Sequence, residues 1–290
     1  MSHIFDADKR ARFFDSTFAP VQFDLLKSGQ ITHLHARDQI ALGILGALPA
    51  GCRVLDYGCG QGRLLAELLN RGYDAYGYEP SAGMAGLATE HFLKGREDRL
   101  LIGAENQLAA LHGQQYDVVL LMGVTQYLSD AEYREVFARC RAFLKPGGRL
   151  LVTFQNGLFD LFTFNKYTVD AIVHMLMGGL LSEQEQATVT ASIERLLTHP
   201  TLPAFSENRA RDSIFVRLSN PLTIADDLRD VGFDFDRLWF YEWFGLPPLL
   251  TSESADLAAR IKAAFEVTNA QDWRGHFMAN AFLVVATPRM

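Results

Sequence analysis

The sequence has no long apolar run and no excess of positive charge. Nowhere do about 18 consecutive apolar residues follow one another, as a membrane span would require, and the apolar stretch 171–181 is interrupted by His174 and by glycines. Residues 1–12 are polar and charged, unlike a secretory leader. The formal net charge is −7, whereas nucleic-acid backbones are bound by Lys and Arg. We therefore expect no membrane span and no nucleic-acid partner.

Cysteine is scarce, and no metal-binding pattern occurs. The three cysteines, Cys52, Cys59 and Cys140, are odd in number and lack the spacing of a metal site. No cluster of Asp, Glu and His has such a spacing either, so no metal is expected. Small unpaired thiols fit a reducing compartment, and this predicts a cytoplasmic protein.

Short apolar runs alternate with segments of helical period between residues 52 and 154. The predicted strands cover 53–57, 75–78, 100–102, 117–122 and 149–154. Gly72 stands where a C-terminal helix cap belongs, and Ser129 with Glu132 forms the S-x-x-E pattern of an N-terminal capping box. This alternation predicts the α/β class, with a doubly wound, mostly parallel sheet and helices on both faces.

Four segments follow from this pattern. Residues 1–50 form an N-terminal helical segment, 51–155 a cofactor-binding core, 156–220 a helical insertion or lid, and 221–290 the C-terminal completion of the sheet. Within the last segment we predict a helix over 223–231, a strand over 233–243, a helix over 254–265 and a final strand over 281–286. The sheet would then have seven strands.

A glycine-rich loop follows the first strand, in the order Asp56, Tyr57, Gly58, Cys59, Gly60, Gln61, Gly62. Glycines permit a sharp turn and a close approach of the main chain to a ligand. A dinucleotide fingerprint would require glycine at position 63, which is Arg63. Asp56 would oppose a pyrophosphate but suits an ammonium group, and Glu79, at the end of the second strand, can accept the hydroxyls of a ribose. The loop predicts a nucleoside ligand that carries an ammonium group.

Several segments together resemble the class I S-adenosylmethionine-dependent methyltransferases. They are the glycine loop, Tyr78–Ser81, Tyr116–Val119, Gly123–Leu128 and Leu144–Leu150, and the resemblance covers residues 50–155 best. It implies a Rossmann-like methyltransferase fold, methyltransferase activity and S-adenosylmethionine as cofactor. The cofactor-binding residues that it implies are Asp56, Gly58, Gly60, Gly62, Glu79, Pro80, Ala104, Glu105, Met122 and Gly123.

The chain departs from the family pattern at two points. Many relatives have an adenine-binding Asp after the third strand, where this chain reads Ala104-Glu105, so either Glu105 or main-chain groups would hold the adenine. Many small-molecule members have a His after the fourth strand, where this chain has Gln126 and Tyr127. A family-type general base is therefore not identified at that point.

Transfer of a methyl group to a hydroxyl is helped by a base that removes the proton of the hydroxyl. Tyr127, His174 and His276 are the candidates for this catalytic role, although each histidine is also compatible with a solvated or structural residue, and Tyr127 with a pocket wall. Gln126, Tyr127, Trp273 and Arg274 are the candidates for substrate binding.

The nature of the acceptor is open. Aromatic residues crowd the insertion and the segment 239–244, which fits a lid over an apolar or sugar face, a second core or a homodimer interface. The tracts 220–222, 239–250 and 272–275 are similar to methyltransferases of bacterial surface-polysaccharide pathways, which favours O-methylation of a small or carbohydrate-like acceptor. The alternatives are N- or O-methylation of an aromatic, quinone or polyketide metabolite, a catalytically silent cofactor-binding protein, and, last, a nicotinamide oxidoreductase.

Overall fold

The computed structural model describes residues 6–27, 36–49, 51–103, 113, 115–163, 167–176, 180–197, 214–244 and 271–289. The chain divides into two compact units. The first, here the core unit, comprises Ile4–Thr153, Ala225–Arg237 and Val284–Met290, and the second unit comprises Met1–His3, Phe154–Ile224 and Leu238–Leu283.

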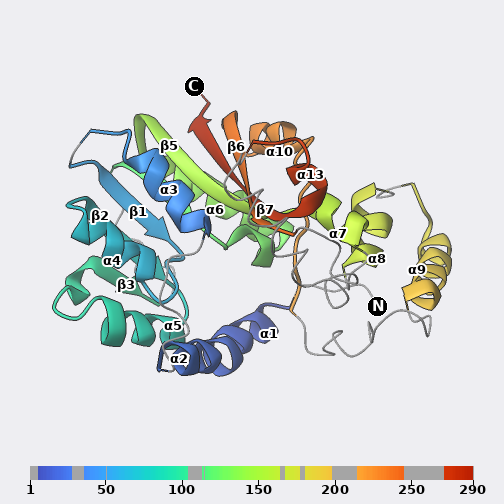
Figure 1. Ribbon diagram of the computed structural model, residues 1–290, viewed down its shortest axis with the longest axis horizontal. Coiled ribbons are helices and arrows are strands. Elements are labelled where there is room, and N and C mark those ends of the chain that lie inside the picture. The colour runs from blue at the N-terminus through green and yellow to red at the C-terminus, as the bar shows by residue number, and fades with distance from the viewer. Residues whose placement is uncertain are drawn as a thin grey trace. The chain divides into compact units, whose positions relative to one another are not determined.

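A seven-stranded sheet with flanking helices carries the fold (Figure 1). Its strands are β1 (Arg53–Tyr57), β2 (Asp74–Glu79), β3 (Leu100–Ile102), β4 (Tyr116–Leu121), β5 (Leu144–Gln155), β6 (Phe233–Trp243) and β7 (Ala279–Pro288). Their order is β3-β2-β1-β4-β5-β7-β6, and the pairs β1–β2, β1–β4, β2–β3 and β4–β5 are parallel. The strand order reverses direction next to β1, and at such a switch point ligands bind beyond the carboxyl ends of the strands. The predicted fold class is confirmed.

The central strands contain continuous apolar runs because both of their faces are covered there. In β4 the run Val118–Leu121 is fully buried, as is Leu150–Val152 of β5. Such continuous runs are typical of parallel strands with helices on both sides. The helices of the core unit after β1 include α4 (Arg63–Asn70), α5 (Ala82–Leu87), α6 (Asp130–Phe143) and most of α10 (Ile224–Asp230), and its short turns include η2 (Ala88–Phe92) and η3 (Glu97–Arg99).

The helix ends follow the predicted caps. Gly72, with a φ of 83°, closes the turn after α4. Ser129 caps α6, and its hydroxyl accepts from the N–H of Glu132 while Glu132 accepts from the N–H of Ser129. Gly232, with a φ of 86°, follows α10. These residues determine where the helices begin and end.

Strand β5 differs from the prediction at its start. We expected Lys145–Gly148 to be a turn before a strand beginning at Arg149, but the strand begins at Leu144. Tyr116 of β4 pairs with Leu144 and Val118 pairs with Arg149, so the intervening residues form a bulge in the pairing. A bulge adds residues to one strand without ending it, and for this reason a Pro-Gly-Gly tract can lie inside a strand. The helix predicted over 254–265 lies outside the described residues.

The N-terminal residues of the core unit are helical, as predicted. They comprise α1 (Ala7–Arg12), the π-helical turn η1 (Phe13–Phe18), α2 (Ala19–Lys27) and, separately, α3 (Ala36–Leu45). Helix α2 and η1 contact α5. Ala19, Met84 and Leu87 form a small buried cluster there, against which Phe18 and Phe23 pack.

In the second unit the described helices are α7 (Gly157–Thr163), α8 (Thr168–Asp170), η6 (Ala171–Leu176), α9 (Glu183–Leu197) and α13 (Gly275–Met278). Val189 and Ile193 of α9 pack on the buried Val169 and Val173, as the amphipathic pattern of that helix indicates. Among the described residues, no helix is both long and apolar enough to cross a membrane.

Candidate functional site: a cavity at the carboxyl ends of the central strands

The glycine loop leaves β1 with three left-handed glycines. Gly58, Gly60 and Gly62 have φ values of 81°, 58° and 75°, a region that side chains with a Cβ rarely adopt. A Cβ on Gly58 would lie 2.5 Å from Cγ2 of Val124, in the loop after β4. The N–H groups of Gly58 and Cys59 both donate to the carbonyl of Tyr78, at 2.7 and 3.0 Å. The glycines are therefore required by the backbone and by close packing between the two loops.

Glu79 ends β2 with its carboxylate turned to this loop. Its Oε2 accepts from the N–H of Gly60 at 2.7 Å, and its Oε1 accepts from the N–H of Ser81 at 2.9 Å. The side chain is 6% exposed. Burial raises the pKa of Glu79 to about 7, against the lowering effect of the two N–H donors. The carboxylate is thus held in place by two backbone donors and titrates near neutrality.

Asp56 is the second buried acid of the site. It is 2% exposed at the end of β1. Its pKa is raised to about 7, chiefly by burial and then by the nearby charge of Asp38, while Arg37 opposes the rise. Asp38 and Arg37 come from α3 and form an ion pair with an Nε–Oδ1 distance of 3.2 Å. Acids and guanidinium groups thus lie together beside the glycine loop.

These side chains line a cavity of about 560 Å³ within the core unit. Most of the residues predicted to bind cofactor or substrate line it, namely Asp56, Gly58, Gly60, Glu79, Pro80, Met122, Gly123, Gln126 and Tyr127. Gly62 instead caps α4 with its left-handed conformation. Ala104 and Glu105 lie outside the described residues. The volume is typical of a pocket for a small ligand.

Tyr127 stands on the short turn η5 (Thr125–Tyr127) after β4. The turn is fixed to β5 because Thr125 Oγ1 donates to the Thr153 carbonyl at 2.6 Å and the Gly123 N–H donates to Thr153 Oγ1 at 2.7 Å. The ring of Tyr127 meets Phe14 edge to face, with centroids 5.1 Å apart. An aromatic wall therefore bounds one part of the cavity.

The N-terminal segment adds cavity-lining residues that the sequence did not indicate. Arg10, Phe14, Asp15, Phe18 and Gln22 all line the cavity. Arg37, Asp38 and Arg63 line it too. The sequence feature that could have indicated these residues is a pair of charged residues next to an apolar helical stretch, as at Arg37-Asp38. It was weak, because surface helices have the same pattern.

The remaining predicted residues belong to the second unit. His174 is half exposed, with Nε2 3.9 Å from Oδ1 of Asp170. His276 has Nδ1 2.8 Å from the carbonyl oxygen of Trp273. A carbonyl only accepts, so this contact favours the tautomer with the proton on Nδ1 and the lone pair on Nε2. Arg274 is paired with Asp272, and Trp273 is 69% exposed. The catalytic and substrate-binding roles of these residues stay predictions.

Comparison with known proteins defines the class. A family model described as a methyltransferase domain matches residues 31–234. The chain is similar to a ubiquinone biosynthesis O-methyltransferase of Rhizobium leguminosarum bv. trifolii, with 28% identity over 186 residues, 63% of this chain and 70% of that protein. The corresponding protein of Rhodopseudomonas palustris is 33% identical over 132 residues, 45% of this chain and 50% of that protein.

A solved structure agrees in fold. The magnesium protoporphyrin IX methyltransferase of Synechocystis PCC 6803, crystallised with bound SAH, superposes with a TM-score of 0.51 at 16% identity and covers 98% of this chain and 100% of that chain. The chain belongs to the methyltransferase-domain family. The predicted class, an S-adenosylmethionine-dependent methyltransferase with a Rossmann-like fold, is confirmed.

Proposed function

We propose that the chain transfers a methyl group from S-adenosylmethionine to a hydroxyl of an aromatic small molecule of the phenol or quinone type. The observation that carries the proposal is that the two buried acids, Asp56 and Glu79, line the same cavity as the aromatic side chains of Phe14 and Tyr127. One region suits a charged nucleoside and the other a flat apolar ring.

The acids of the cavity fit the cofactor. A carboxylate has about four acceptor positions, and Glu79 uses two of them for the N–H groups of Gly60 and Ser81. The other positions remain for the ribose hydroxyls. Asp56 would bind the ammonium group, with Asp38 adding negative charge. We assign Gly58, Gly60 and Pro80 to main-chain and packing contacts, and Gly62 to shaping the loop.

The basic side chains of the cavity fit the rest of the amino-acid part. Arg37 and Arg63 are suited to the α-carboxylate, because a guanidinium pairs with a carboxylate through two parallel hydrogen bonds. Met122 and Gly123 would lie beside the methyl group. When bound, the cofactor supplies an electrophilic methyl group on a sulfonium centre. We place the adenine near Ala104 and Glu105.

The work left to the protein is alignment and removal of one proton. Holding donor and acceptor in line supplies much of the reduction in barrier. Tyr127 and Gln126 would orient the acceptor hydroxyl, and Tyr127, His276 or His174 would receive its proton. Trp273 and Arg274 are further candidates for holding the acceptor. Each of these roles is testable by substitution.

Two observations support an aromatic acceptor. Curated relatives of the chain are named ubiquinone biosynthesis O-methyltransferases, and rings of the N-terminal segment line the cavity next to Tyr127. A carbohydrate-like hydroxyl, the acceptor first expected from the sequence, has no comparable support. It stays a prediction, as do the homodimer and the cytoplasmic location.

Calorimetric titration with S-adenosylhomocysteine tests the cofactor site. We expect micromolar binding to the wild type, a loss of about tenfold or more in Glu79→Ala, and no change in the control Glu90→Ala, an exposed acid on η2. Methyl transfer is then assayed with catechols, hydroquinones and free sugars. Turnover of sugars alone would overturn the aromatic assignment, and binding of NADH in place of S-adenosylhomocysteine would overturn the methyltransferase proposal.

A further inference from the structure

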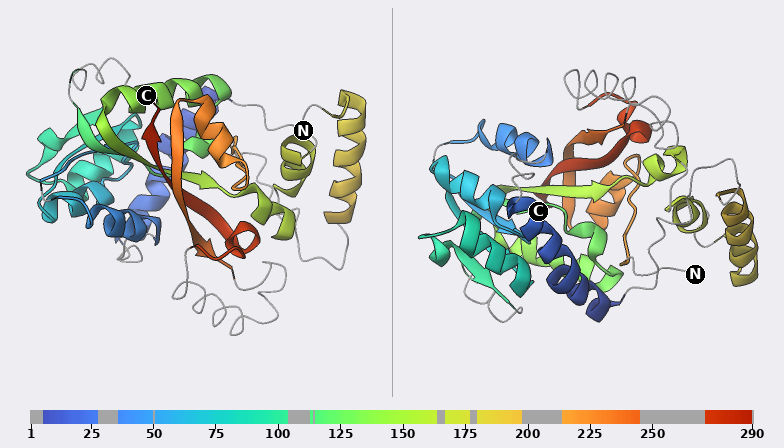
Figure 2. Two further views of the ribbon diagram at one scale, coloured as in Figure 1. Left: turned by 90° about the horizontal axis from the view of Figure 1, so that it is seen from above. Right: turned by 60° about the horizontal axis from the view of Figure 1, so that its bottom comes forward.

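The N-terminal segment runs as one continuous helical rod along the cavity. Helix α1, the turn η1 and helix α2 follow one another without a break from Ala7 to Lys27, and Figure 2 shows them as a single dark-blue rod. Arg10, Phe14, Phe18 and Gln22 line the cavity at intervals of four residues. One face of the rod therefore follows the cavity for several turns.

The π-helical turn explains how this face stays aligned. An α-helix turns about 100° per residue, so a four-residue repeat drifts around it by about 40° at each step. A π-turn, with its i→i+5 hydrogen bonds, is wider and reverses such drift. The N–H of Ala19 donates to the carbonyl of Phe14, five residues earlier. The turn η1 lies in the middle of the lining face, and π-turns frequently occur at functional sites.

Two polar contacts fasten the rod to opposite sides of the cavity. On the ribose side, Asp15 Oδ1 accepts from Ser81 Oγ at 2.6 Å and from the Gly83 N–H at 3.1 Å. Ser81 in turn donates its N–H to Glu79. Asp15 is therefore linked through Ser81 to Glu79, the proposed ribose-binding carboxylate.

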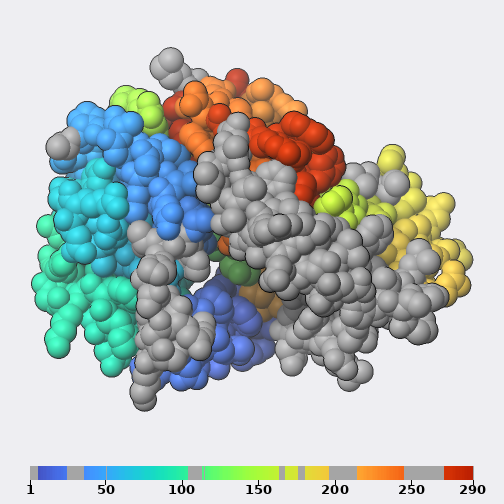
Figure 3. Space-filling model, viewed as in Figure 1, coloured from blue at the N-terminus to red at the C-terminus, as the bar shows by residue number. Residues whose placement is uncertain are grey.

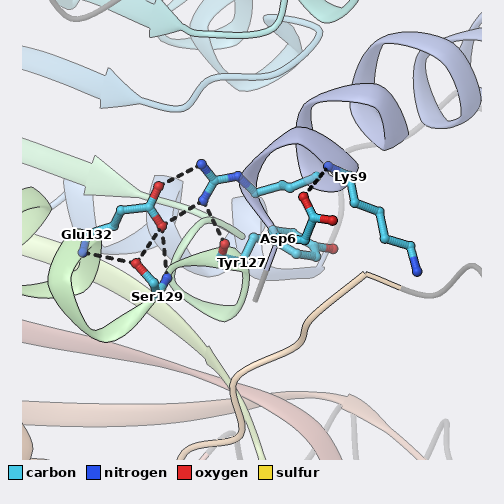
Figure 4. A network of polar contacts seen from close by, with 6 residues as sticks. Asp6, Lys9, Tyr127, Ser129 and Glu132 are labelled. Carbon is cyan, nitrogen blue, oxygen red and sulfur yellow. Dashed lines mark hydrogen bonds and ion pairs between the residues drawn. The ribbon is translucent and has the colours of Figure 1, made fainter. Parts of the chain in front are cut away.

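On the acceptor side, the fastening residue is Arg10. Its Nη1 donates to the Tyr127 carbonyl at 2.9 Å, and its guanidinium forms a two-point pair with Glu132 at 2.7 and 3.0 Å. In Figure 4 the Tyr127 main chain, Glu132 and the capping hydroxyl of Ser129 lie together at this contact. Arg10 thus ties the rod to the turn that carries Tyr127 and to the cap of α6.

We propose that residues 7–27 act as a strap that joins the two sides of the cavity, and that Arg10 and Asp15 are the positioning residues that hold it. The inference rests on the proposed function, because the strap matters when a cofactor occupies the cavity. With both contacts made, the strap slows departure of the cofactor and keeps Tyr127 facing the acceptor.

The strap is held weakly enough to open. The side chains of Arg10 and Glu132 are 24% and 30% exposed, and partly exposed ion pairs contribute little to stability. The described apolar contact with α5 is a small cluster. In Figure 3 the dark-blue strap lies at the surface along the lower edge of the face shown. Surface elements with few buried contacts open locally at low free energy.

The test compares two strap variants with matched controls on the same rod. Arg10→Gln and Asp15→Ala each remove one contact, whereas Arg12→Gln and Asp8→Ala make the same chemical change at exposed positions of α1. We measure dissociation of S-adenosylhomocysteine by stopped flow. We expect each strap variant to dissociate about fivefold faster or more, the scale of a lost charge-assisted hydrogen bond, and the controls to match the wild type.

Two further readouts separate a strap from a local structural role. Release of one end loosens the whole segment, so the double variant should dissociate more slowly than the product of the two single effects predicts, whereas independent sites add. Arg10→Gln should lower kcat more than it changes the KM for the acceptor, and Arg10→Lys, which keeps a cationic donor, should recover part of the lost kcat. Additive single effects would overturn the strap.

Hydrogen exchange on the protein alone keeps the inference independent of the cofactor assignment. Asp15→Ala should speed amide exchange across 123–129, on the side of the cavity that Asp15 does not touch. Acceleration confined to 79–83 would overturn the strap, even if S-adenosylhomocysteine does not bind. Binding by the wild type with unchanged dissociation in both variants would overturn the strap and leave the proposed function intact.

Discussion

The backbone N–H of Gly60 donates a hydrogen bond of 2.7 Å to Oε2 of Glu79, and this contact joins the glycine loop to the end of the neighbouring strand. The acid is buried, and its pKa lies near 7 for that reason. A carboxyl group that changes charge close to neutral pH makes both the stability and the ligand affinity of the protein depend on pH.

The first prediction is that Glu79→Gln destabilises the protein at pH 5, because the amide nitrogen cannot accept from one of the two backbone N–H groups, and that the loss is smaller at pH 8. The folded-state pKa of Glu79, about 7, exceeds its ordinary value of 4.5. The stability that this shift contributes is complete below the ordinary pKa and is lost as the pH rises through 7, because the folded state then binds more protons than the unfolded state. The loss is on the order of 3 kcal/mol, and glutamine does not undergo it.

Urea unfolding of wild type and Glu79→Gln at both pH values tests this. The same sign analysis applies to Asp56, whose pKa is also raised to about 7. Affinity for S-adenosylhomocysteine should move in the opposite direction and rise from pH 6 to pH 8, because the ribose hydroxyls favour the charged carboxylate. Equal destabilisation of Glu79→Gln at pH 5 and pH 8 would show that the carboxylate is charged throughout, contrary to the prediction.

The second prediction concerns Gly58→Ala. A Cβ there would collide with Val124, and the φ of 81° strains any residue other than glycine. We expect a loss of about 2 kcal/mol or more in the free energy of unfolding. Adding Val124→Ala should recover the part due to the collision but not the part due to φ. Gly86→Ala is the control, because Gly86 lies within α5 with open space around its Cα, and alanine there should stabilise by up to about 1 kcal/mol. Thermal unfolding of the four proteins distinguishes the contributions.

Much of the sheet follows from local pattern. The structures of the run Val118–Leu121 and of the glycine loop after Tyr57 can be predicted from the sequence. A strand buried on both faces requires a continuous apolar run, and a left-handed turn requires glycine. The bulge at Lys145–Gly148 was read as a turn. A Pro-Gly-Gly sequence is compatible with a turn and with a bulge inside a strand, and only the pairing of Leu144 with Tyr116 of β4 shows that it is a bulge.

The cofactor side of the cavity could be predicted for the same reason, whereas its other walls could not. Asp56 and Glu79 follow strands whose ends meet at one edge of the sheet. Arg10, Asp15 and Arg37 reach the cavity only because their helices pack on distant segments, and a helical pattern does not state what the helix packs against. Their charged side chains read as ordinary surface in the sequence.

A third prediction fixes the tautomer of His276. Because Nδ1 faces the Trp273 carbonyl at 2.8 Å, the neutral ring should be the Nδ1–H form, with its lone pair on Nε2. Long-range proton–nitrogen correlation spectra at pH 8 distinguish the two forms, and the half-exposed His174 is the control, with its Nε2 facing Asp170. Finding Nε2–H in His276 would remove it from the candidate bases.

A fourth prediction concerns Asn156, which organises the second unit. Its side chain is fully buried, and its Nδ2 lies 3.1, 3.0 and 2.8 Å from the carbonyl oxygens of Gly275, His276 and Ala279. Its Oδ1 accepts from the N–H of Leu158 at 3.1 Å. An amide satisfies this arrangement because it supplies donors on one side and an acceptor on the other.

Asn156→Asp places a carboxyl oxygen against those carbonyls. The carboxylate form is repelled, so the folded state should raise the pKa of the new acid, and the variant should lose stability progressively as the pH rises. Asn156→Ala should cost about 2–4 kcal/mol at every pH, because it leaves buried carbonyls without a donor. Asn70→Asp, at an exposed position whose side chain accepts from Arg96, should cost nothing. Urea unfolding at pH 5.5 and 8 measures all three, and a pH-independent loss in Asn156→Asp would contradict the predicted rise in the pKa of the new acid.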